Sequence, residues 1–451
     1  MKKLIYTFAV VLVAVSCNLE EINENPNVPN QVPLSTLLPP TQKTIADVQG
    51  GQLFRINNIF SQHMEGDDDR PLDFERYNPS ELFIGNSWND LYTSSIINLK
   101  IIAERANEEG SPHYAGVAKV LLAQALGLLT DTWGNVPFRE AAQGAQAINP
   151  AYDDQELIYN EIHRLLDEAM IELKLEESIF TPGSDDIIYN GNLQNWIAAA
   201  NMLKARYLMH TTKRNQEAAT EALMFLMEGF NSSSDDLEYP YLGTGEDINP
   251  INGYFAGTDF MVIDEQFLGL MESSDDPRID FAFKILPFTG GLRQPGNYFA
   301  SPQSPVELAS YTEQLFLLAE ARLRTGDTPG AESALQEAIG LSMAEISEGE
   351  INQEQIDTYL AANANLSGSF EPDLEIIIRE KYIELFTSPE PWTDFRRTGY
   401  PNLEPNDGGT SAANPSGEIP RRLIYPQSER LRNQNFPSPA PNMQDRFWWD
   451  E

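Results

Sequence analysis

Hydrophobic residues recur at helical spacing in much of the chain. Clusters of Gly, Pro and Asn separate the segments concerned, which are 87–107, 114–130, 155–175, 193–214 and 216–227. No stretch alternates between apolar and polar residues over more than a few positions, and we therefore expect few strands. The pattern predicts a mostly α-helical fold.

The clearest two-helix unit lies in residues 311–343. Its spacing matches a tetratricopeptide hairpin, with Ala319 at the small position of the first helix and Ala331, Leu335 and Ala338 at packing positions of the second. Small residues suit these positions because two helices that cross closely cannot both carry large side chains. We expect tetratricopeptide-like helical repeats packed against a loop-rich remainder with few short strands.

Two weaker pairs can be drawn with insertions between their helices: 118–129 with 158–173, and 196–208 with 219–227. Two long segments, near 231–305 and 402–442, are instead rich in Pro, Gly, Asn and Ser. Loops of this length are uncommon in a compact domain unless they have a function. The sequence therefore predicts a single helical domain, 41–451, with these two irregular insertions.

Residues 1–16 have the pattern of a lipoprotein signal peptide. Two lysines precede an apolar run of twelve residues, 4–15, which is too short to cross about 30 Å of hydrocarbon. Cys17, the only cysteine, follows at a position that resembles a bacterial lipoprotein cleavage site. We expect acyl chains on Cys17 to hold the protein at a membrane, and dense prolines to make 17–40 an extended tether.

The composition excludes several classes of function. The 451 residues include 68 acids and 30 bases, for a formal net charge of −38. Such a chain does not suit nucleic acid, because phosphate neutralisation needs clustered Lys and Arg, or electrostatic docking on anionic lipid. One cysteine allows no intrachain disulfide, and four histidines leave little material for a zinc site.

Catalytic motifs are mostly absent. The chain has no Gly-x-Ser-x-Gly elbow, no phosphate-binding glycine loop and no His-Glu-x-x-His. The acidic run 67–69, with Asp73 and Glu75 nearby, lacks the spacing of a twelve-residue calcium loop, so a solvated loop is the better interpretation and calcium is unsupported. We expect no cofactor and no enzymatic activity.

Six segments form a distinctive combination. They are 25–27 (Asn-Pro-Asn), 88–92 (Trp-Asn-Asp-Leu-Tyr), 131–138 (Asp-Thr-Trp-Gly-Asn-Val-Pro-Phe), 311–321, 392–401 (Trp-Thr-Asp-Phe-Arg-Arg-Thr-Gly-Tyr-Pro) and 419–426 (Ile-Pro-Arg-Arg-Leu-Ile-Tyr-Pro). In this order, over nearly the whole chain, they resemble the SusD/RagB family of nutrient-binding outer-membrane lipoproteins.

The resemblance implies a SusD-like fold and a cell-surface protein of the outer membrane. Family members cover a SusC-like TonB-dependent transporter, capture oligosaccharides or other nutrients and do no chemistry. Glu20 and Glu21, just after the acylation site, resemble a surface-export signal. Two alternatives stay open from the residues alone: a secreted carbohydrate-active hydrolase, with two facing carboxylates of which one has a raised pKa, and a protein-binding helical-repeat scaffold.

A ligand site for an oligosaccharide needs exposed aromatic rings beside amides or carboxylates. We assign Trp133, Trp196 and Trp392 to the core and expect exposed rings in the irregular stretches. The candidate rings are Phe74, Tyr77, Trp88, Tyr239, Tyr241, Tyr254 and Tyr298. The candidate hydrogen-bonding neighbours are Gln62, His63, Asp67, Asp69 and Asn297. At least two members of this set are predicted to line the site.

Overall fold

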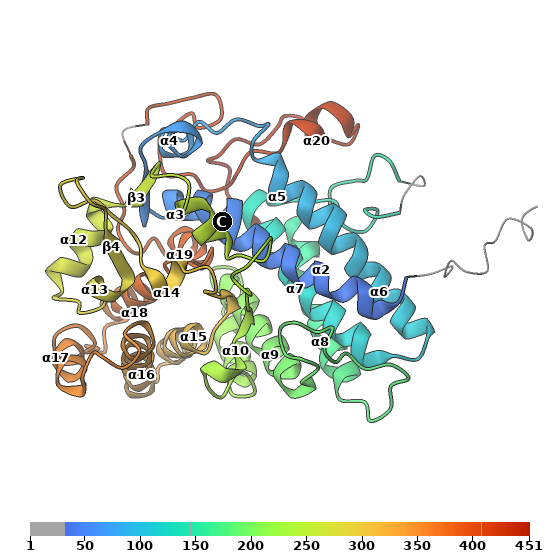
Figure 1. The fold of residues 1–451 in the computed structure, drawn as a ribbon, viewed down its shortest axis with the longest axis horizontal. Coiled ribbons are helices and arrows are strands. Elements are labelled where there is room, and N and C mark those ends of the chain that lie inside the picture. The colour runs from blue at the N-terminus through green and yellow to red at the C-terminus, as the bar shows by residue number, and fades with distance from the viewer. Residues whose placement is uncertain (1–31, 144–146, 407) are drawn as a thin grey trace, which may run out of the picture.

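Three antiparallel helix pairs form the frame of the protein. The computed structural model describes residues 32–143, 147–406 and 408–451. The pairs form a row along the lower half of Figure 1, in which α8 also contacts α9 and α10 contacts α15. They are α7 (Pro112–Trp133) with α8 (Gln155–Leu173), α9 (Leu193–His210) with α10 (Ala218–Leu226), and α15 (Tyr311–Arg324) with α16 (Thr328–Ile346). This row confirms the predicted two-helix unit and both weaker pairs.

Small residues let these helices approach one another. A Cβ added to Gly127 of α7 would lie 1.9 Å from the Tyr207 hydroxyl of α9, and one added to Gly116 would lie 2.6 Å from Leu173 of α8. In the last pair, Ala319 and Ala331 are fully buried. Their cluster extends to α17 (Gln353–Asn363) and α18 (Phe370–Glu384), which lengthen the row.

The first described helix corrects one prediction. Residues 17–31 of the expected tether, like the expected signal peptide and Cys17, lie outside the described residues, but from Leu34 the chain is helical. Helix α2 (Leu34–Val48) continues through a π-helical turn, Gln49–Leu53, into α3 (Phe54–Phe60), and contains both Pro39 and Pro40. Burial of its apolar face, including Leu38 and Ile45, outweighs the cost of the prolines.

A second long helical run crosses the same side of the molecule. It consists of α5 (Gly85–Asp90), a π-helical turn at Leu91–Ile96 and α6 (Ile97–Glu108), and it packs against α2 and α7. In Figure 1 these helices occupy the right-hand side. The predicted helix at 87–107 is therefore confirmed.

Strands are few and short in the described residues, as predicted. They form three antiparallel pairs: β1 (Met64–Gly66) with β3 (Met261–Ile263), β2 (Leu237–Tyr239) with β6 (Val306–Ala309), and β4 (Phe283–Ile285) with β5 (Arg293–Pro295). Five of these six strands lie in the irregular stretch after α10 or at the end of that stretch. The irregular stretch therefore folds into small sheets and short helices over the helical row.

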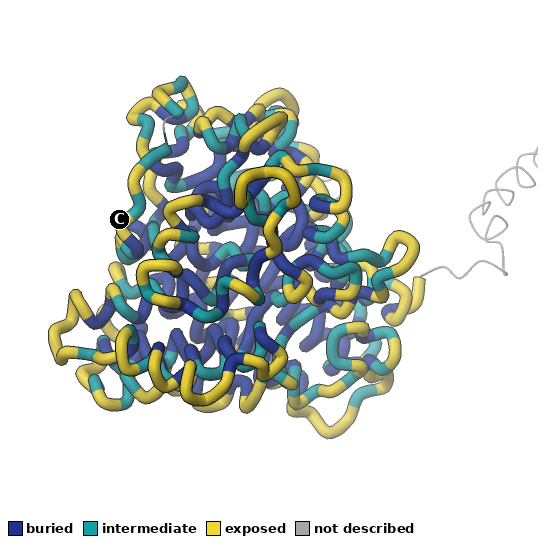
Figure 2. Tube along the Cα trace, turned by 60° about the vertical axis from the view of Figure 1, so that its left-hand side comes forward, coloured by how far each residue is buried: buried dark blue, intermediate teal, exposed yellow. Residues whose placement is uncertain are grey.

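Further short helices in the described residues complete the loop-rich part. They are α4 (Asp69–Glu75), α11 (Pro250–Phe255), α12 (Glu265–Ser273), α13 (Ile279–Ala282), α14 (Asn297–Ala300), α19 (Glu390–Thr398) and α20 (Gln427–Arg432), with 3-10 turns at Ser233–Asp235 and Trp448–Asp450. Exposed residues concentrate in the connecting loops, around a buried interior (Figure 2). None of the helices described here has the length and hydropathy needed to cross a membrane.

The arginine-containing motifs are structural. Arg396 donates to the carbonyl of Asp131 over 2.7 Å, and Arg422 donates to the carbonyl of Trp133, so both satisfy free carbonyls at the end of α7. Trp133, Trp196 and Trp392 are buried, as predicted, and the Trp392 indole donates to the carbonyl of Pro420.

Candidate functional site

Most of the predicted ligand-contacting side chains are buried. The expectation of exposure is wrong for Gln62, His63, Phe74, Tyr77, Trp88, Tyr239 and Tyr241. A ring that is buried on both faces cannot stack on a sugar. The reasons differ between three regions of the fold.

Near the β1–β3 pair, the chain folds back over its own aromatic residues. Phe74 and Tyr77 both meet the ring of Phe60 edge to face. The backbone N–H of Asn406, far along the chain, donates to the Tyr77 hydroxyl over 3.0 Å, and Gln62 donates to the Asn406 side chain over 2.9 Å. The C-terminal irregular stretch therefore covers rings that the local sequence leaves open.

His63 is a neutral core residue. Its ring stacks on Tyr382 with 3.9 Å between centroids, and its Nδ1 and Nε2 lie 2.8 Å from Ser61 Oγ and from the carbonyl of Tyr382. Burial lowers the pKa of His63 to about 3. The imidazole is therefore uncharged at neutral pH and fully occupied.

The other buried rings belong to helix contacts. Trp88 meets Trp133 and Tyr425 edge to face. The Tyr241 hydroxyl donates to Asp47 of α2 over 2.8 Å, and the Tyr239 ring packs beside it. These rings pack α2 and α5 against the rest of the fold.

Five predicted residues remain accessible. Asp67, Asp69, Asn297 and Tyr298 are exposed, and Tyr254 is partly buried. Asn297 and Tyr298 line a groove, Tyr254 lies on a second surface, and Asp67 and Asp69 lie in the solvated acidic run at the start of α4. That at least two members of the predicted set line the ligand site stays a prediction.

The first surface is a groove of about 480 Å³, called here the acidic groove. It lies between the β2–β6 pair, α14 and the end of α16. The ring of Tyr298 is 37% exposed, the one large aromatic side chain of the groove lining that exceeds a third, and amides of Asn297 and Gln303 accompany it. The lining also holds five carboxylates and no Lys, Arg or His; the carboxylates are Asp236, Glu238, Glu307, Glu345 and Glu348.

The groove retains protons at neutral pH. Burial, together with the charges of Glu345 and Glu238, raises the pKa of Asp236 to about 8, although the backbone N–H of Tyr311 donates to it over 2.6 Å. Burial and the neighbouring Asp236 also raise the pKa of Glu307 well above its usual range. Because no base neutralises these groups, some carboxyls keep a proton and can donate hydrogen bonds as well as accept them.

The second surface carries two guanidinium groups on aromatic rings, and we call it the guanidinium surface. Arg55 lies 4.8 Å from the ring centroid of Tyr254, and Arg70 lies 4.0 Å from that of Phe83. Within the described residues, no carboxylate forms a salt bridge with either arginine. Sequence reasoning missed Arg55, Arg70 and Phe83; the available signal was the rarity of bases in this acidic chain.

The acidic run 67–69 has a local structural role. The Asp68 side chain accepts the backbone N–H of Asp69 and caps α4, while Asp67 and Asp69 point into solvent. In the part of the chain that the structure describes, no three His, Cys, Asp or Glu side chains form a group suited to a metal ion.

A tetratricopeptide-like helical row that supports a loop-rich half with an open, ring-bearing groove defines a helical binding protein. A family profile described as "Starch-binding associating with outer membrane" matches residues 26–426, and the chain belongs to this SusD-like family. A search of curated proteins finds no match.

Solved structures share the fold. A SusD/RagB family protein from Bacteroides thetaiotaomicron superposes with a TM-score of 0.78 at 23% identity, over 93% of this chain and 99% of that one. A chitin-binding SusD homolog from Flavobacterium johnsoniae gives 0.79 at 22%, over 93% and 98%. A SusD homolog from Bacteroides uniformis gives 0.77 at 21%, over 93% and 99%. The predicted SusD-like fold is thus confirmed.

Proposed function

We propose that the protein is a cell-surface lipoprotein that binds a glycan in the acidic groove and delivers it to a SusC-like TonB-dependent transporter. The observation that carries the proposal is the partly exposed Tyr298, flanked by the amides of Asn297 and Gln303 in an open groove. Membership of a family described as starch-binding, and the chitin-binding name of a structural neighbour, support a polysaccharide as the class of ligand.

The chemistry of the groove favours an uncharged sugar. A sugar ring presents C–H groups on its faces and hydroxyls on its edges, which match one aromatic face and a rim of amides and carboxyls. Five carboxylates without a base would repel an anionic polysaccharide. The ligand is therefore a neutral oligosaccharide, or one that carries amino groups.

Attachment to the membrane rests on Cys17. A net charge of −38 gives the protein no electrostatic reason to approach an anionic surface, whereas acyl chains contribute about 0.8 kcal/mol for each buried methylene. Cys17→Ser should abolish palmitate labelling and leave the protein unprocessed or soluble. Full labelling of that variant would refute the anchor.

Binding is tested by a glycan array followed by calorimetry with the best oligosaccharide. We expect the wild-type protein to bind at least one neutral glycan and Tyr298→Ala to bind it more weakly. A wild-type protein that binds no glycan on the array, and only peptides, would exclude the proposed ligand class and favour the protein-binding scaffold.

The raised pKa values of Asp236 and Glu307 are also what a hydrolase requires of a general acid. A reducing-sugar assay with the bound oligosaccharide separates the two functions. We expect no release of reducing ends. Release that Asp236→Asn and Glu307→Gln both abolish would instead assign the groove to catalysis.

Delivery is tested on native membranes. Mild detergent should release the protein together with a much larger barrel transporter, because a lid that covers a pore needs a large contact surface. Recovery of the protein alone in several gentle detergents would count against delivery and leave glycan binding as a separate function.

A further inference from the structure

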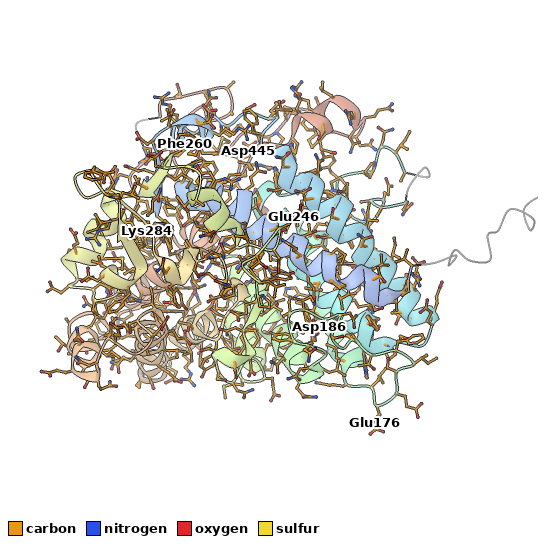
Figure 3. All side chains as sticks on the ribbon, viewed as in Figure 1. Glu176, Asp186, Glu246, Phe260, Lys284 and Asp445 are labelled. Atoms are coloured by element: carbon orange, nitrogen blue, oxygen red, sulfur yellow. The ribbon has the colours of Figure 1, made fainter. Side chains whose placement is uncertain are left out.

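Exposed apolar side chains concentrate at one end of the molecule. Ile171, Leu175, Ile179 and Phe180 lie within ten consecutive residues at the end of α8 and in the following loop, with exposed fractions of 65%, 48%, 70% and 56%. We call these four residues the apolar end. In Figure 3 the labelled Glu176 marks this loop, at the lower right of the view.

The loop is held in place, so this exposure is a feature of the fold. His113 of α7 lies 2.8 Å from the carbonyl of Leu175 and 2.9 Å from the Thr181 hydroxyl. The backbone N–H of Ile179 donates to the carbonyl of Gly110 over 3.0 Å, and that of Phe180 to Ser111 Oγ over 3.1 Å. The apolar end is therefore fixed on the turn between α6 and α7.

The described part of the chain begins beside the same turn. Arg105, in the last turn of α6, donates to the carbonyl of Val32 over 2.7 Å, and the side chain of Val32 is itself exposed. Figure 1 shows α2 beginning at this right-hand end, next to α6. The start of the described chain and the apolar end thus share one end of the protein.

Covalent length limits how far this end can lie from the anchor. Fifteen residue steps separate Cys17 from Val32, and a fully extended chain of that length spans at most about 50 Å. Once Cys17 is acylated, Val32 and the apolar end beside it are therefore held within roughly this distance of the membrane surface. The apolar end is thus placed to meet a protein embedded there.

We propose that the apolar end docks on the outward-facing surface of the transporter; this rests on the proposed function. Exposed apolar residues grouped in this way mark interaction sites. The exposed charges among them are Lys174, Glu176 and Glu177, because Glu172 pairs with Lys119. A protein surface with apolar pockets therefore fits this mainly apolar, weakly acidic segment better than anionic lipid headgroups. None of the four residues lines the acidic groove, which leaves glycan binding and docking on separate surfaces.

The test compares two matched double variants of the full-length acylated protein. Ile179→Glu with Phe180→Glu changes the apolar end, and Ile285→Glu with Phe288→Glu changes an Ile of similar exposure and a more exposed Phe at the β4–β5 hairpin. The readout is the amount of transporter that copurifies in mild detergent. We expect the apolar-end variant to recover at least tenfold less transporter than wild type and the hairpin variant to recover as much as wild type. Both variants should keep the wild-type melting temperature and glycan affinity.

Other results would overturn the proposal in distinguishable ways. If wild type brings down the transporter and the apolar-end variant does so equally, the docking surface is wrong while delivery stands. If wild type brings down no transporter although it binds glycan, delivery fails and docking with it. A third result would assign the apolar end to lipid. In that case Ile179→Glu with Phe180→Glu leaves transporter recovery of the acylated protein unchanged. The same substitutions in a Cys17→Ser background then abolish binding to vesicles of lipopolysaccharide and phosphatidylethanolamine.

Discussion

Two clusters of carboxylates in this protein have opposite electrostatics. Where α19 packs on the helical frame, Arg397 of α19 donates to both carboxylate oxygens of the fully buried Glu320 of α15, and Asp394 of α19 pairs with Lys381 of α18 over 2.9 Å. In the acidic groove, Asp236 and Glu307 face other carboxylates and no base. The frame thus pairs its buried charges, whereas the groove leaves them unpaired.

The pKa values follow this difference. Burial alone would raise the pKa of Glu320, but the Arg397 guanidinium lowers it well below its usual range. Burial and like charges raise the pKa of Asp236 to about 8. Paired buried carboxylates are typical of structure, and perturbed, unpaired carboxylates in a cleft are typical of function. The same residue types therefore have different roles according to whether an arginine accompanies them.

The largest expected effect concerns the frame. Arg397→Met removes the bidentate partner of the buried Glu320 and leaves Arg324, 2.7 Å away, as its remaining salt-bridge partner. The free energy of unfolding should fall by about 3 kcal/mol at neutral pH. The lowered pKa means that this stabilisation is present above the ordinary carboxyl pKa and is lost as the pH falls. Denaturant unfolding at pH 7 and pH 3 measures both the loss and its decrease in acid.

A surface pair provides the control for this variant. Arg430 pairs with Glu81 over 2.7 Å, but both side chains are about a third exposed or more. Arg430→Met should therefore leave the free energy of unfolding nearly unchanged. Equal losses of unfolding free energy in Arg397→Met and Arg430→Met would show that the buried ion pair stabilises the protein no more than the surface pair. The contrast between the frame and the groove would then be wrong.

The second prediction separates a ligand-contacting ring from buried rings. Tyr298→Ala should weaken glycan binding by about 1 to 3 kcal/mol, by analogy with bases stacked on aromatic rings, and should leave the melting temperature nearly unchanged. Trp88→Ala should instead cost about 3 to 5 kcal/mol of stability because it opens a cavity in the core. Calorimetry and thermal unfolding are measured on both, and wild-type affinity in Tyr298→Ala would contradict the placement of the site.

Helical spacing predicted most of the frame because both sides of each contact appear in local sequence. Ala319 and Ala331 carry the signal of a close helix crossing within thirteen residues, and the structure confirms it. The start of α2 was missed because its prolines argue locally against a helix, whereas the buried face that stabilises it is a tertiary property.

The site was predicted less well because burial in irregular segments depends on distant residues. Tyr77 is covered by Asn406, more than three hundred positions later, and no local pattern shows that contact. The amide of Asn297 beside the aromatic ring of Tyr298 is a pattern visible in local sequence, and both residues line the acidic groove. The carboxylates Asp236, Glu307 and Glu345 come from three separate elements, so their meeting in one groove was not readable from spacing.

The third prediction concerns the pH dependence of stability that Asp236 in the groove causes, which has the opposite sign to that caused by Glu320 in the frame. Because the pKa of Asp236 is higher folded than unfolded, folding takes up a proton and stability declines as the pH rises from about 4 to about 8. Asp236→Asn removes the contribution of this group to the decline, while Glu307, whose pKa is also raised, keeps its own. The variant should gain on the order of 1 kcal/mol over wild type at pH 8.5, since one pKa unit corresponds to about 1.4 kcal/mol, and nothing at pH 3.5. A gain that is equal at both pH values would point to altered packing instead of relieved repulsion.

The smallest expected effects concern the guanidinium surface. Variants of this surface test whether the glycan binds there or in the acidic groove. Arg70 is exposed and stacks on Phe83, so Arg70→Ala should cost no more than about 0.5 to 1 kcal/mol of stability, the usual strength of an exposed cation–π contact. Because the ligand proposed for the acidic groove is uncharged or cationic and Arg70 does not line that groove, removal of this guanidinium should change glycan affinity less than threefold. Calorimetry on Arg70→Ala and Tyr254→Ala, beside Tyr298→Ala, compares the two surfaces directly. If the first two variants lose binding and Tyr298→Ala retains it, the glycan binds on the guanidinium surface, and the unpaired carboxylates of the groove need another explanation.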